Sequence, residues 1–143
     1  MRIKVFLDTN VLLDMLVTSR DPQKNAQSII TAVKKCLLDA QVSTQSIIDV
    51  CYSARRQKLE DSIFMSFLKD IRRYVNISPI YATDLDWAME NYSGDFEDDA
   101  QYACAYDGCC DFFITNDKEL LKRNGTSPMV VMSPGDFVAK MRQ

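Results

Sequence analysis

Short apolar runs and longer amphipathic stretches alternate along this chain. The apolar runs are typical of buried strands, and they lie at residues 3–7, 41–43, 74–77, 111–115 and 129–132. Between them, apolar residues recur at the three- and four-residue spacing of helices. Strand and helix signals that alternate in this way predict an α/β fold, with a mostly parallel sheet covered by helices on both faces.

Cap and turn signals mark where the predicted helices begin and end. Arg20-Asp21-Pro22 predicts the start of a helix over about 22–39, because Asp is a good N-cap and Pro suits the first helical position. Asn124-Gly125 predicts a turn before the last strand. The candidate N-caps of the other helices are Thr44 or Ser46, Glu60 or Asp61, Thr83 or Asp84, Asp95 and Ser133.

Length and composition indicate one globular domain. A chain of 143 residues with 47% hydrophobic and 26% charged residues can bury a core, and it shows no linker or repeat that would divide it. No run approaches the roughly 18 apolar residues that cross a bilayer, and Asp8 and Asp14 interrupt the apolar region near the start. We therefore expect a single domain over 1–143, a cytoplasmic location and no membrane association.

The absence of histidine narrows the chemistry. With no His in the chain, Ser-His-Asp and Cys-His catalysis are excluded. The five Cys residues are odd in number and include no Cys-x-x-Cys pair, so we interpret them as buried, reduced thiols rather than zinc ligands. Hydrolytic chemistry in this chain must therefore come from carboxylates, together with a metal ion.

Acidic residues gather in the second half of the chain. Residues 1–80 carry 12 Lys or Arg against 8 Asp or Glu, whereas residues 81–143 carry 5 against 12. From Tyr74 to Asp117 there are ten acids and no Lys or Arg, in a stretch too rich in aromatic residues to be disordered. Such a block is either a solvated face or a set of packed carboxylates, and a divalent cation relieves the repulsion within a packed set.

Carboxylates stand where predicted strands end. Asp8 and Asp117 each follow a strand directly, and the carboxyl ends of parallel strands meet at one edge of a sheet. A crossover connection can bring the acid-rich helix start at 95–99 to the same edge. Oxygen ligands of this kind suit Mg²⁺ or Mn²⁺. Helix capping is the alternative interpretation of Asp8, Asp95 and Asp117, and solvent exposure that of Asp49.

The acidic blocks of this chain resemble those of the PIN domain family. They are Phe6-Leu7-Asp8-Thr9-Asn10-Val11, Asp95-Phe96-Glu97-Asp98 followed by Ala103-Cys104-Ala105, and Phe113-Ile114-Thr115-Asn116-Asp117. The order and spacing of these blocks are the specific part of the resemblance, which covers essentially the whole chain. Within the family, the chain resembles the VapC-like ribonuclease toxins of bacterial toxin–antitoxin pairs.

The resemblance implies both a topology and an activity. The implied fold is a three-layer α/β/α arrangement around a mostly parallel five-stranded sheet with the order 3-2-1-4-5. The implied activity is that of an endoribonuclease in which Asp8, Asp98 and Asp117 bind Mg²⁺ or Mn²⁺. Asn10 and Thr115 match the polar residues that orient the ligands or the attacking water. A metal-activated water would attack an RNA phosphodiester and leave 3′-hydroxyl and 5′-phosphate ends.

The second acidic position departs from the family pattern. The family has a Glu on the helix after the second strand, whereas Asp49 is the only acid between Gln41 and Leu59. We carry Asp49 into that catalytic role, with a shorter reach that favours a water-mediated contact. The choice of Asp98 over Asp99 also rests on the resemblance, because helical periodicity alone places Asp99 nearer the edge of the apolar stripe.

The resemblance further implies a small antitoxin partner and a homodimer. The RNA substrate, a tRNA or an mRNA, is expected to contact the main concentration of basic residues; a solvated surface without a partner is the alternative. These basic residues are Arg55, Arg56, Lys58, Lys69, Arg72 and Arg73. A sequence pI near 4.9 argues against strong non-specific binding and favours a few contacts to a structured RNA.

Two other functions compete with this hypothesis. Phosphatases of the haloacid-dehalogenase type also open with a strand followed by Asp, but they use a second acid two residues later, where this chain has Asn10. The other alternative is a PIN-like protein with a weakened site that acts through binding alone. The presence of Asp49 in place of Glu and the acidic pI keep that second alternative open beside the ribonuclease hypothesis.

Overall fold

A parallel sheet forms the centre of the molecule in the computed structural model, which describes residues 2–17, 23–123 and 128–143. Within these ranges the strands pair in the order β3-β2-β1-β4-β5, and the predicted topology is confirmed. The strands are β1 (Lys4–Leu7), β2 (Asp39–Ser43), β3 (Asn76–Ser78), β4 (Phe112–Ile114) and β5 (Val130–Met132). Because β1 and β4 are neighbours, their carboxyl ends meet at the middle of one edge.

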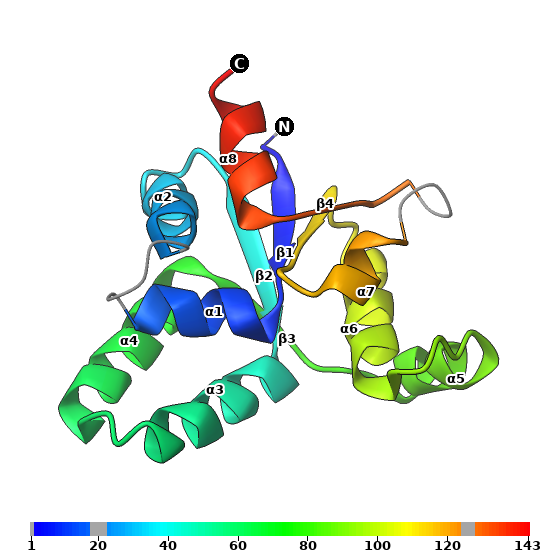
Figure 1. Cartoon of the computed structure of the whole chain (residues 1–143), viewed down its shortest axis with the longest axis horizontal. Helices are drawn as coiled ribbons and strands as arrows, with labels where there is room; N and C mark the ends of the chain where they lie inside the picture. The colour runs from blue at the N-terminus through cyan, green and yellow to red at the C-terminus, as the bar shows by residue number, and fades with distance from the viewer. Residues whose placement is uncertain (1, 18–22, 124–127) are drawn as a thin grey trace.

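Helices cover both faces of this sheet. They are α1 (Thr9–Leu16), α2 (Gln23–Lys34), α3 (Thr44–Arg56), α4 (Asp61–Tyr74), α5 (Ala82–Glu90), α6 (Phe96–Asp107), α7 (Lys118–Leu121) and α8 (Pro134–Met141). Figure 1 shows α1 to α4 on one side of the sheet and α5 to α7 on the other, and α8 packs against α2. The three-layer α/β/α prediction is therefore confirmed. No helix in the described ranges is long and apolar enough to cross a membrane.

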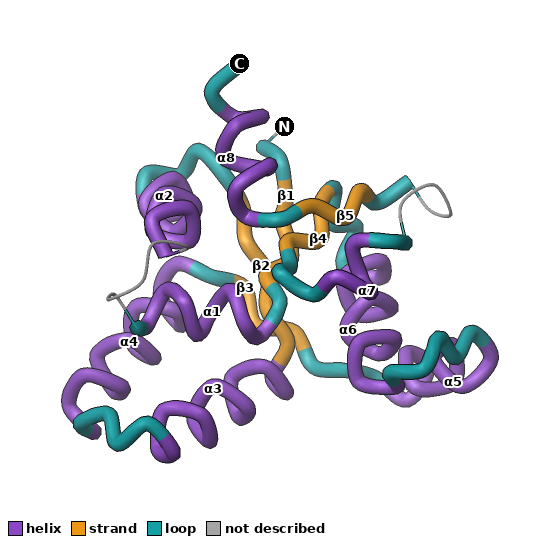
Figure 2. Tube along the Cα trace, viewed as in Figure 1, coloured by secondary structure: helices purple, strands orange, loops and turns teal. Residues whose placement is uncertain are grey.

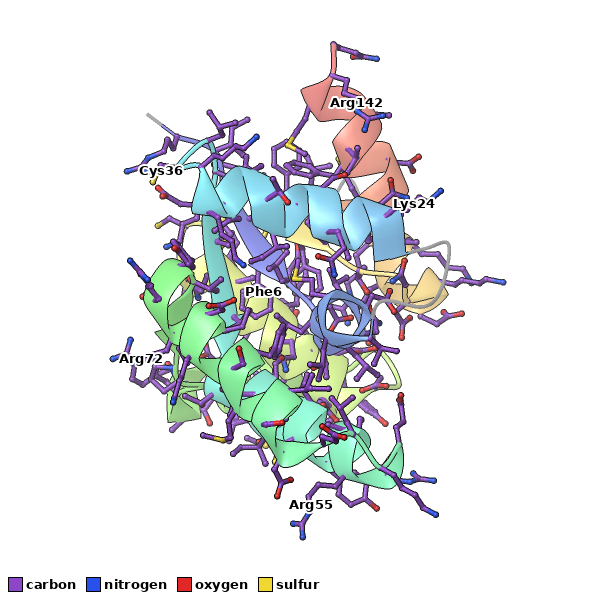
Figure 3. All side chains as sticks on the ribbon, turned by 90° about the vertical axis from the view of Figure 1, so that its left-hand side faces the viewer. Phe6, Lys24, Cys36, Arg55, Arg72 and Arg142 are labelled. Carbon is purple, nitrogen blue, oxygen red and sulfur yellow. The ribbon has the colours of Figure 1, made fainter. Side chains whose placement is uncertain are left out.

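Strand β1 is buried on both of its faces. Val5 and Leu7 belong to the core beneath α1 to α4, whereas Phe6 points to the opposite core beneath α6 and α7. This is the alternation that a strand imposes on successive side chains. Phe6, which lies in the interior in Figure 3, stacks on Phe113 of β4 with a centroid distance of 5.1 Å. The packing fixes the two central strands whose ends carry the acids.

The helix predicted over 22–39 is shorter than its periodicity suggested. It ends at Lys34, and Cys36 then adopts a left-handed φ of 60° that turns the chain toward β2. Leu37, which continues the apolar spacing, is 65% exposed after this turn. The prediction for residues 35–39 is therefore wrong. The signals at Arg20-Asp21-Pro22 and Asn124-Gly125 lie outside the described residues.

The N-caps of two helices differ from the predicted residues. Ser43, the last residue of β2, caps α3, and its hydroxyl accepts from the Ser46 amide at 3.0 Å. Tyr81 occupies the cap position of α5, and the Asp84 carboxylate reaches back to accept from its amide at 2.9 Å. The predicted cap roles of Thr44, Ser46, Thr83 and Asp84 are therefore wrong, because each helix begins earlier than its polar residues suggested.

The cysteines lie in different environments. Cys104 and Cys110 are buried and Cys51 is half-buried, all three as free thiols. Cys36 and Cys109 are exposed, so the prediction of burial is wrong for these two. Both occupy left-handed turns that follow helices, with φ values of 60° and 57°.

Candidate active site

Asp8 stands at the point where β1 ends and α1 begins. Its amide still donates to the Ile114 carbonyl of β4 at 3.0 Å, while its Oδ1 accepts from the Thr9 amide at 2.8 Å and caps α1. Its Oδ2 accepts from the Thr115 hydroxyl at 2.7 Å and from the Asn10 side-chain amide at 3.3 Å. Burial raises the pKa of Asp8, and these hydrogen bonds oppose the increase. Asp8 is thus a helix cap and also a carboxylate held at the sheet edge.

Asp117 occupies the matching position after β4. Its Oδ1 accepts from the amides of Glu119 at 2.8 Å and Leu120 at 3.3 Å and so caps α7. Its own amide donates to the Thr115 hydroxyl at 2.9 Å. Figure 2 shows β1 and β4 side by side, each leading through a short connection into a helix. The charge of Asp117 is close enough to raise the pKa of Asp8.

Asp98 lies near both of these carboxylates. It is in the first turn of α6, where its amide donates to Oδ1 of the cap residue Asp95 at 3.0 Å. Burial, followed by the negative charges of Asp95, Asp8 and Asp117, raises the pKa of Asp98 to about 7. The fold therefore brings Asp8, Asp98 and Asp117 together from three separate elements.

Asp99 has a different environment from its neighbour Asp98. Its side chain is fully buried and accepts hydrogen bonds from the Ser93 amide at 2.9 Å and the Ser93 hydroxyl at 2.6 Å. It also forms an ion pair with Arg123. These contacts tie the start of α6 to the segments on either side of it. The Asp99 carboxylate is therefore occupied by structural contacts. Asp98 is the acid that interacts electrostatically with Asp8.

Glu97 is a carboxylate of this site that sequence reasoning did not single out. A side-chain hydrogen bond with Asp49 of α3, ahead of burial and the nearby acids, raises the pKa of Glu97 to about 7. Asp49 accepts at Oδ1 from the Gln45 side chain at 3.0 Å, and its buried Oδ2 has no partner in the described structure apart from Glu97. The signal in the sequence was the absence of the family's Glu from α3, because a site that lacks this acid needs another acid nearby to replace it.

A buried polar network fixes the helix starts around the acids. The Ser46 hydroxyl shares a hydrogen bond of 2.9 Å with Thr9 of α1, and it accepts from Ser43 at 3.1 Å and from the Gln101 side chain of α6 at 3.0 Å. Ser46 and Gln101 are almost fully buried. The network joins α1, α3 and α6, the helices that carry or follow Asp8, Asp49 and Asp98. The sequence predicted a capping role for Ser46, and no local signal indicated that Gln101 belongs to this network.

The donor set fits a hard divalent cation in chemistry and in charge. All of the donors are oxygens, the carboxyls repel one another, and among the described residues Asp49 Oδ2 has no partner apart from Glu97. Coordinating geometry is not formed, however, since no three Asp, Glu or Cys side chains of the described ranges already surround one point. Part of the reason is that Asp8 and Asp117 direct carboxylate oxygens at helix amides.

The basic residues do not form one patch beside these acids. Arg55, Arg56 and Lys58 lie at the end of α3 and just after it, whereas Arg72 and Arg73 lie in the last turn of α4. Figure 3 shows Arg55 and Arg72 projecting outward at well-separated places. Arg56 lies over the Tyr52 ring at 5.8 Å, and Arg73 lies over the Tyr74 ring at 5.3 Å.

Known proteins share both the sequence pattern and the fold. The model of the PIN domain family matches residues 4–119. Ribonuclease VapC1 of Aquifex aeolicus is 28% identical over 120 residues, which cover 80% of this chain and 82% of that protein. A toxin–antitoxin complex from Klebsiella pneumoniae contains a chain with a TM-score of 0.64 and 19% identity, over 91% of this chain and 97% of that one.

A third similar protein is VapC20 of Mycobacterium tuberculosis, described as a toxin that cleaves the sarcin-ricin loop. Its structure matches with a TM-score of 0.66 and 10% identity, over 87% of this chain and 97% of that one. At such identities the two structural likenesses concern the fold. They agree with the sheet order and the layers described above.

Proposed function

The chain belongs to the PIN domain family, and from this membership we propose that it is a metal-dependent endoribonuclease, the toxin of a type II toxin–antitoxin pair. The observation that carries the proposal is the convergence of Asp8, Asp98 and Asp117 at one edge of the sheet. The name of the Aquifex relative, a ribonuclease, supports RNA as the substrate.

Asp8, Asp98 and Asp117 would hold Mg²⁺ or Mn²⁺ in this proposal. When bound, such a cation lowers the pKa of water and neutralises charge on a phosphoryl oxygen. Thr115 and Asn10 keep the Asp8 carboxylate oriented through their hydrogen bonds. The hydrolysis breaks the bond between phosphorus and O3′, so the products carry 3′-hydroxyl and 5′-phosphate ends.

We assign the second acidic position to Asp49 and Glu97 together. Asp49 is one methylene shorter than the family's Glu, and Glu97 reaches it from α6. When Glu97 is ionised, the pair presents a buried oxygen of Asp49 that has no other partner in the described structure. Such an oxygen accepts a hydrogen bond from a water molecule, and the pair would position the attacking water in this way.

An antitoxin partner and a homodimer are part of the proposal. The similarity of the fold to that of a toxin–antitoxin complex supports the antitoxin. The RNA backbone would contact Arg55, Arg56 and Lys58 at one end of the helix pair α3–α4 and Arg72 and Arg73 at the other. Such separated contacts suit a folded RNA better than a short single strand.

A cleavage panel tests the proposed activity. Total tRNA and mRNA are incubated with the protein in Mg²⁺, in Mn²⁺ or in excess EDTA, and the ends are typed for 5′-phosphate. Cleavage is expected with either metal and not in EDTA. Asp8→Asn should abolish cleavage with an unchanged far-UV spectrum, whereas Asp70→Asn, on the exposed face of α4, should cleave normally. Full activity of Asp8→Asn, or cleavage in EDTA, would contradict the proposal.

A binding protein without catalysis is the second candidate function. The observation in its favour is that the carboxylates of the described residues do not yet surround a common point. A folded protein that cleaves no RNA with either metal, yet binds RNA or a protein partner, would support this candidate over the first.

A further inference from the structure

A cavity of about 830 Å³ lies between α5, α6 and the end of α7. It is large enough for a nucleobase with its sugar and phosphate. The described residues that line it and matter here are Asp84, Trp87, Tyr102, Tyr106, Asp107 and Arg123. None of the functions considered above uses this cavity.

Aromatic rings and a guanidinium form one wall of the cavity. Trp87 of α5 stacks on Tyr102 of α6, with ring centroids 5.7 Å apart and planes 23° from parallel. The guanidinium of Arg123 lies over the Tyr102 ring at 5.2 Å. Flat surfaces of this kind are those on which proteins stack bases that have left an RNA helix.

Hydrogen-bonding groups from α5 and α6, two of them buried and one exposed, line the same cavity. Asp84 is 1% exposed; its Oδ2 accepts from the Tyr81 amide, and in the described structure its carboxyl has no further partner apart from Asp107. Asp107 contacts Asp84 from α6, and the hydrogen bond between the two carboxyls raises the pKa of Asp107 to about 6. The Tyr102 hydroxyl is also buried without a partner there. Unpaired buried groups are costly, and a ligand would satisfy them.

We propose that this cavity binds an unstacked guanine base of the RNA substrate. The carboxylates of Asp84 and Asp107 accept from the adjacent N1–H and N2 amino groups of guanine, and the Tyr102 hydroxyl donates to O6. Adenine and cytosine offer one amino group beside a ring acceptor, and uracil offers one N–H between carbonyls. Guanine is the base whose edge complements two acceptors and a hydroxyl.

The position of the cavity connects it with cleavage, so the inference rests on the proposed ribonuclease function. Asp98, Tyr102 and Tyr106 are four residues apart on α6, which places the cavity about 6 to 12 Å along the helix from the acidic site. Arg123 lines the cavity and also interacts electrostatically with Asp98. A base in the cavity would therefore belong to a nucleotide close to the scissile phosphate.

Trp87 makes the inference directly testable, because it is the only tryptophan of the chain. Its fluorescence is titrated in EDTA, without cleavage, with GMP, AMP, CMP, UMP and inorganic phosphate. Two hexaribonucleotides, oligouridine and the same sequence with one central guanosine, distinguish RNA from a free nucleotide. We expect saturable quenching by GMP and by the guanosine hexamer, with affinities about tenfold or more above those of the other probes.

Variants of single polar groups provide the controls. Asp107→Asn and Tyr102→Phe should each weaken guanine binding about tenfold, whereas Asp86→Asn, an exposed position on α5, should not change it. Equal affinity for all mononucleotides, or unchanged binding by both cavity variants, would overturn the inference. Binding of GMP but not of the guanosine hexamer would overturn RNA as the ligand. Metal-dependent cleavage without guanine binding would overturn this inference alone, and guanine binding without cleavage would overturn the ribonuclease proposal alone.

Discussion

The hydroxyl of Thr115 donates to Oδ2 of Asp8 at 2.7 Å and so ties the end of β4 to the end of β1. The Thr115 hydroxyl oxygen in turn accepts from the Asp117 amide at 2.9 Å. Thr115 is fully buried, so water cannot replace either contact. The relative positions of Asp8 and Asp117 are therefore set by the sheet and this hydroxyl, before any ligand binds.

Replacing Thr115 by Val should weaken metal binding and cleavage, because it removes the hydroxyl that links Asp8 to Asp117. Val keeps the shape but leaves the buried Asp8 Oδ2 without its strongest partner, at a cost of about 1–3 kcal/mol in the free energy of unfolding. We expect weaker Mn²⁺ binding in calorimetry and at least a tenfold loss of cleavage. Urea unfolding measures the stability.

Thr115→Ser is the matched variant, because it restores the hydroxyl without the methyl group. It should recover most of the metal affinity and activity. Thr31→Val, at an exposed site on α2, controls for the change from Thr to Val. Wild-type metal affinity in Thr115→Val would show that the hydroxyl does not position Asp8.

Neighbouring substitutions at Asp98 and Asp99 should have opposite effects. Asp98→Asn removes a charge that four acids repel, so the metal-free protein should gain about 1 kcal/mol at pH 8 after allowance for solvent screening, and lose cleavage. Asp99→Asn breaks the buried ion pair with Arg123 and should cost roughly 3 kcal/mol while the folded fraction still cleaves. Thermal unfolding and specific activity per folded molecule measure both. Loss of cleavage in Asp99→Asn alone would reverse the assignment.

The central strands and their acids could be predicted from the sequence because local signals and the fold agree there. A continuous apolar run before Asp8 and another before Asp117 are what buried parallel strands require. Asp8 and Asp117 each cap a helix as well as lying in the candidate site, so the capping and the functional interpretations are compatible. The alternation of elements was enough to predict the layers, and the sheet order came from the resemblance.

Contacts between elements that are distant in the chain could not be predicted from the sequence. Nothing local shows that Glu97 meets Asp49, since one lies on α6 and the other on α3. Periodicity placed Asp99 near the apolar stripe, but its burial depends on Ser93 and on Arg123, which lies 24 positions further along the chain. Leu37 shows the opposite failure, because a left-handed residue before it rotates an apolar side chain into solvent.

Glu97 and Asp49 should behave as one functional unit. Each of these side chains is the other's hydrogen-bond partner, and alanine removes that partner, so Asp49→Ala and Glu97→Ala should each reduce Mn²⁺ affinity and cleavage about as much as the double variant. A cycle of the two single variants and the double variant measures this coupling. Glu90→Ala, at the exposed end of α5, is the matched control for Glu97→Ala. Additive effects would mean that the two acids act separately.

The stability of the metal-free protein should fall as the pH rises from about 5 to 8. Glu97 and Asp98 have pKa values raised to about 7 in the folded protein, well above the ordinary values near 4, so the folded state binds more protons than the unfolded state between these limits. Raising the pH through this window removes that advantage, and the loss is complete once both carboxyls have ionised. Thermal unfolding in EDTA across the pH range measures the decline.

Divalent metal should reverse this decline, because it binds the ionised carboxylates of the folded state and competes with protons. Saturating Mg²⁺ or Mn²⁺ should raise the melting temperature by roughly 5 °C at pH 8 and by much less at pH 5. The double variant Glu97→Gln, Asp98→Asn should show a flatter pH profile in EDTA and a smaller metal shift. A metal shift of equal size at both pH values, or an unchanged profile in that variant, would locate the titrating and metal-binding groups elsewhere in the chain.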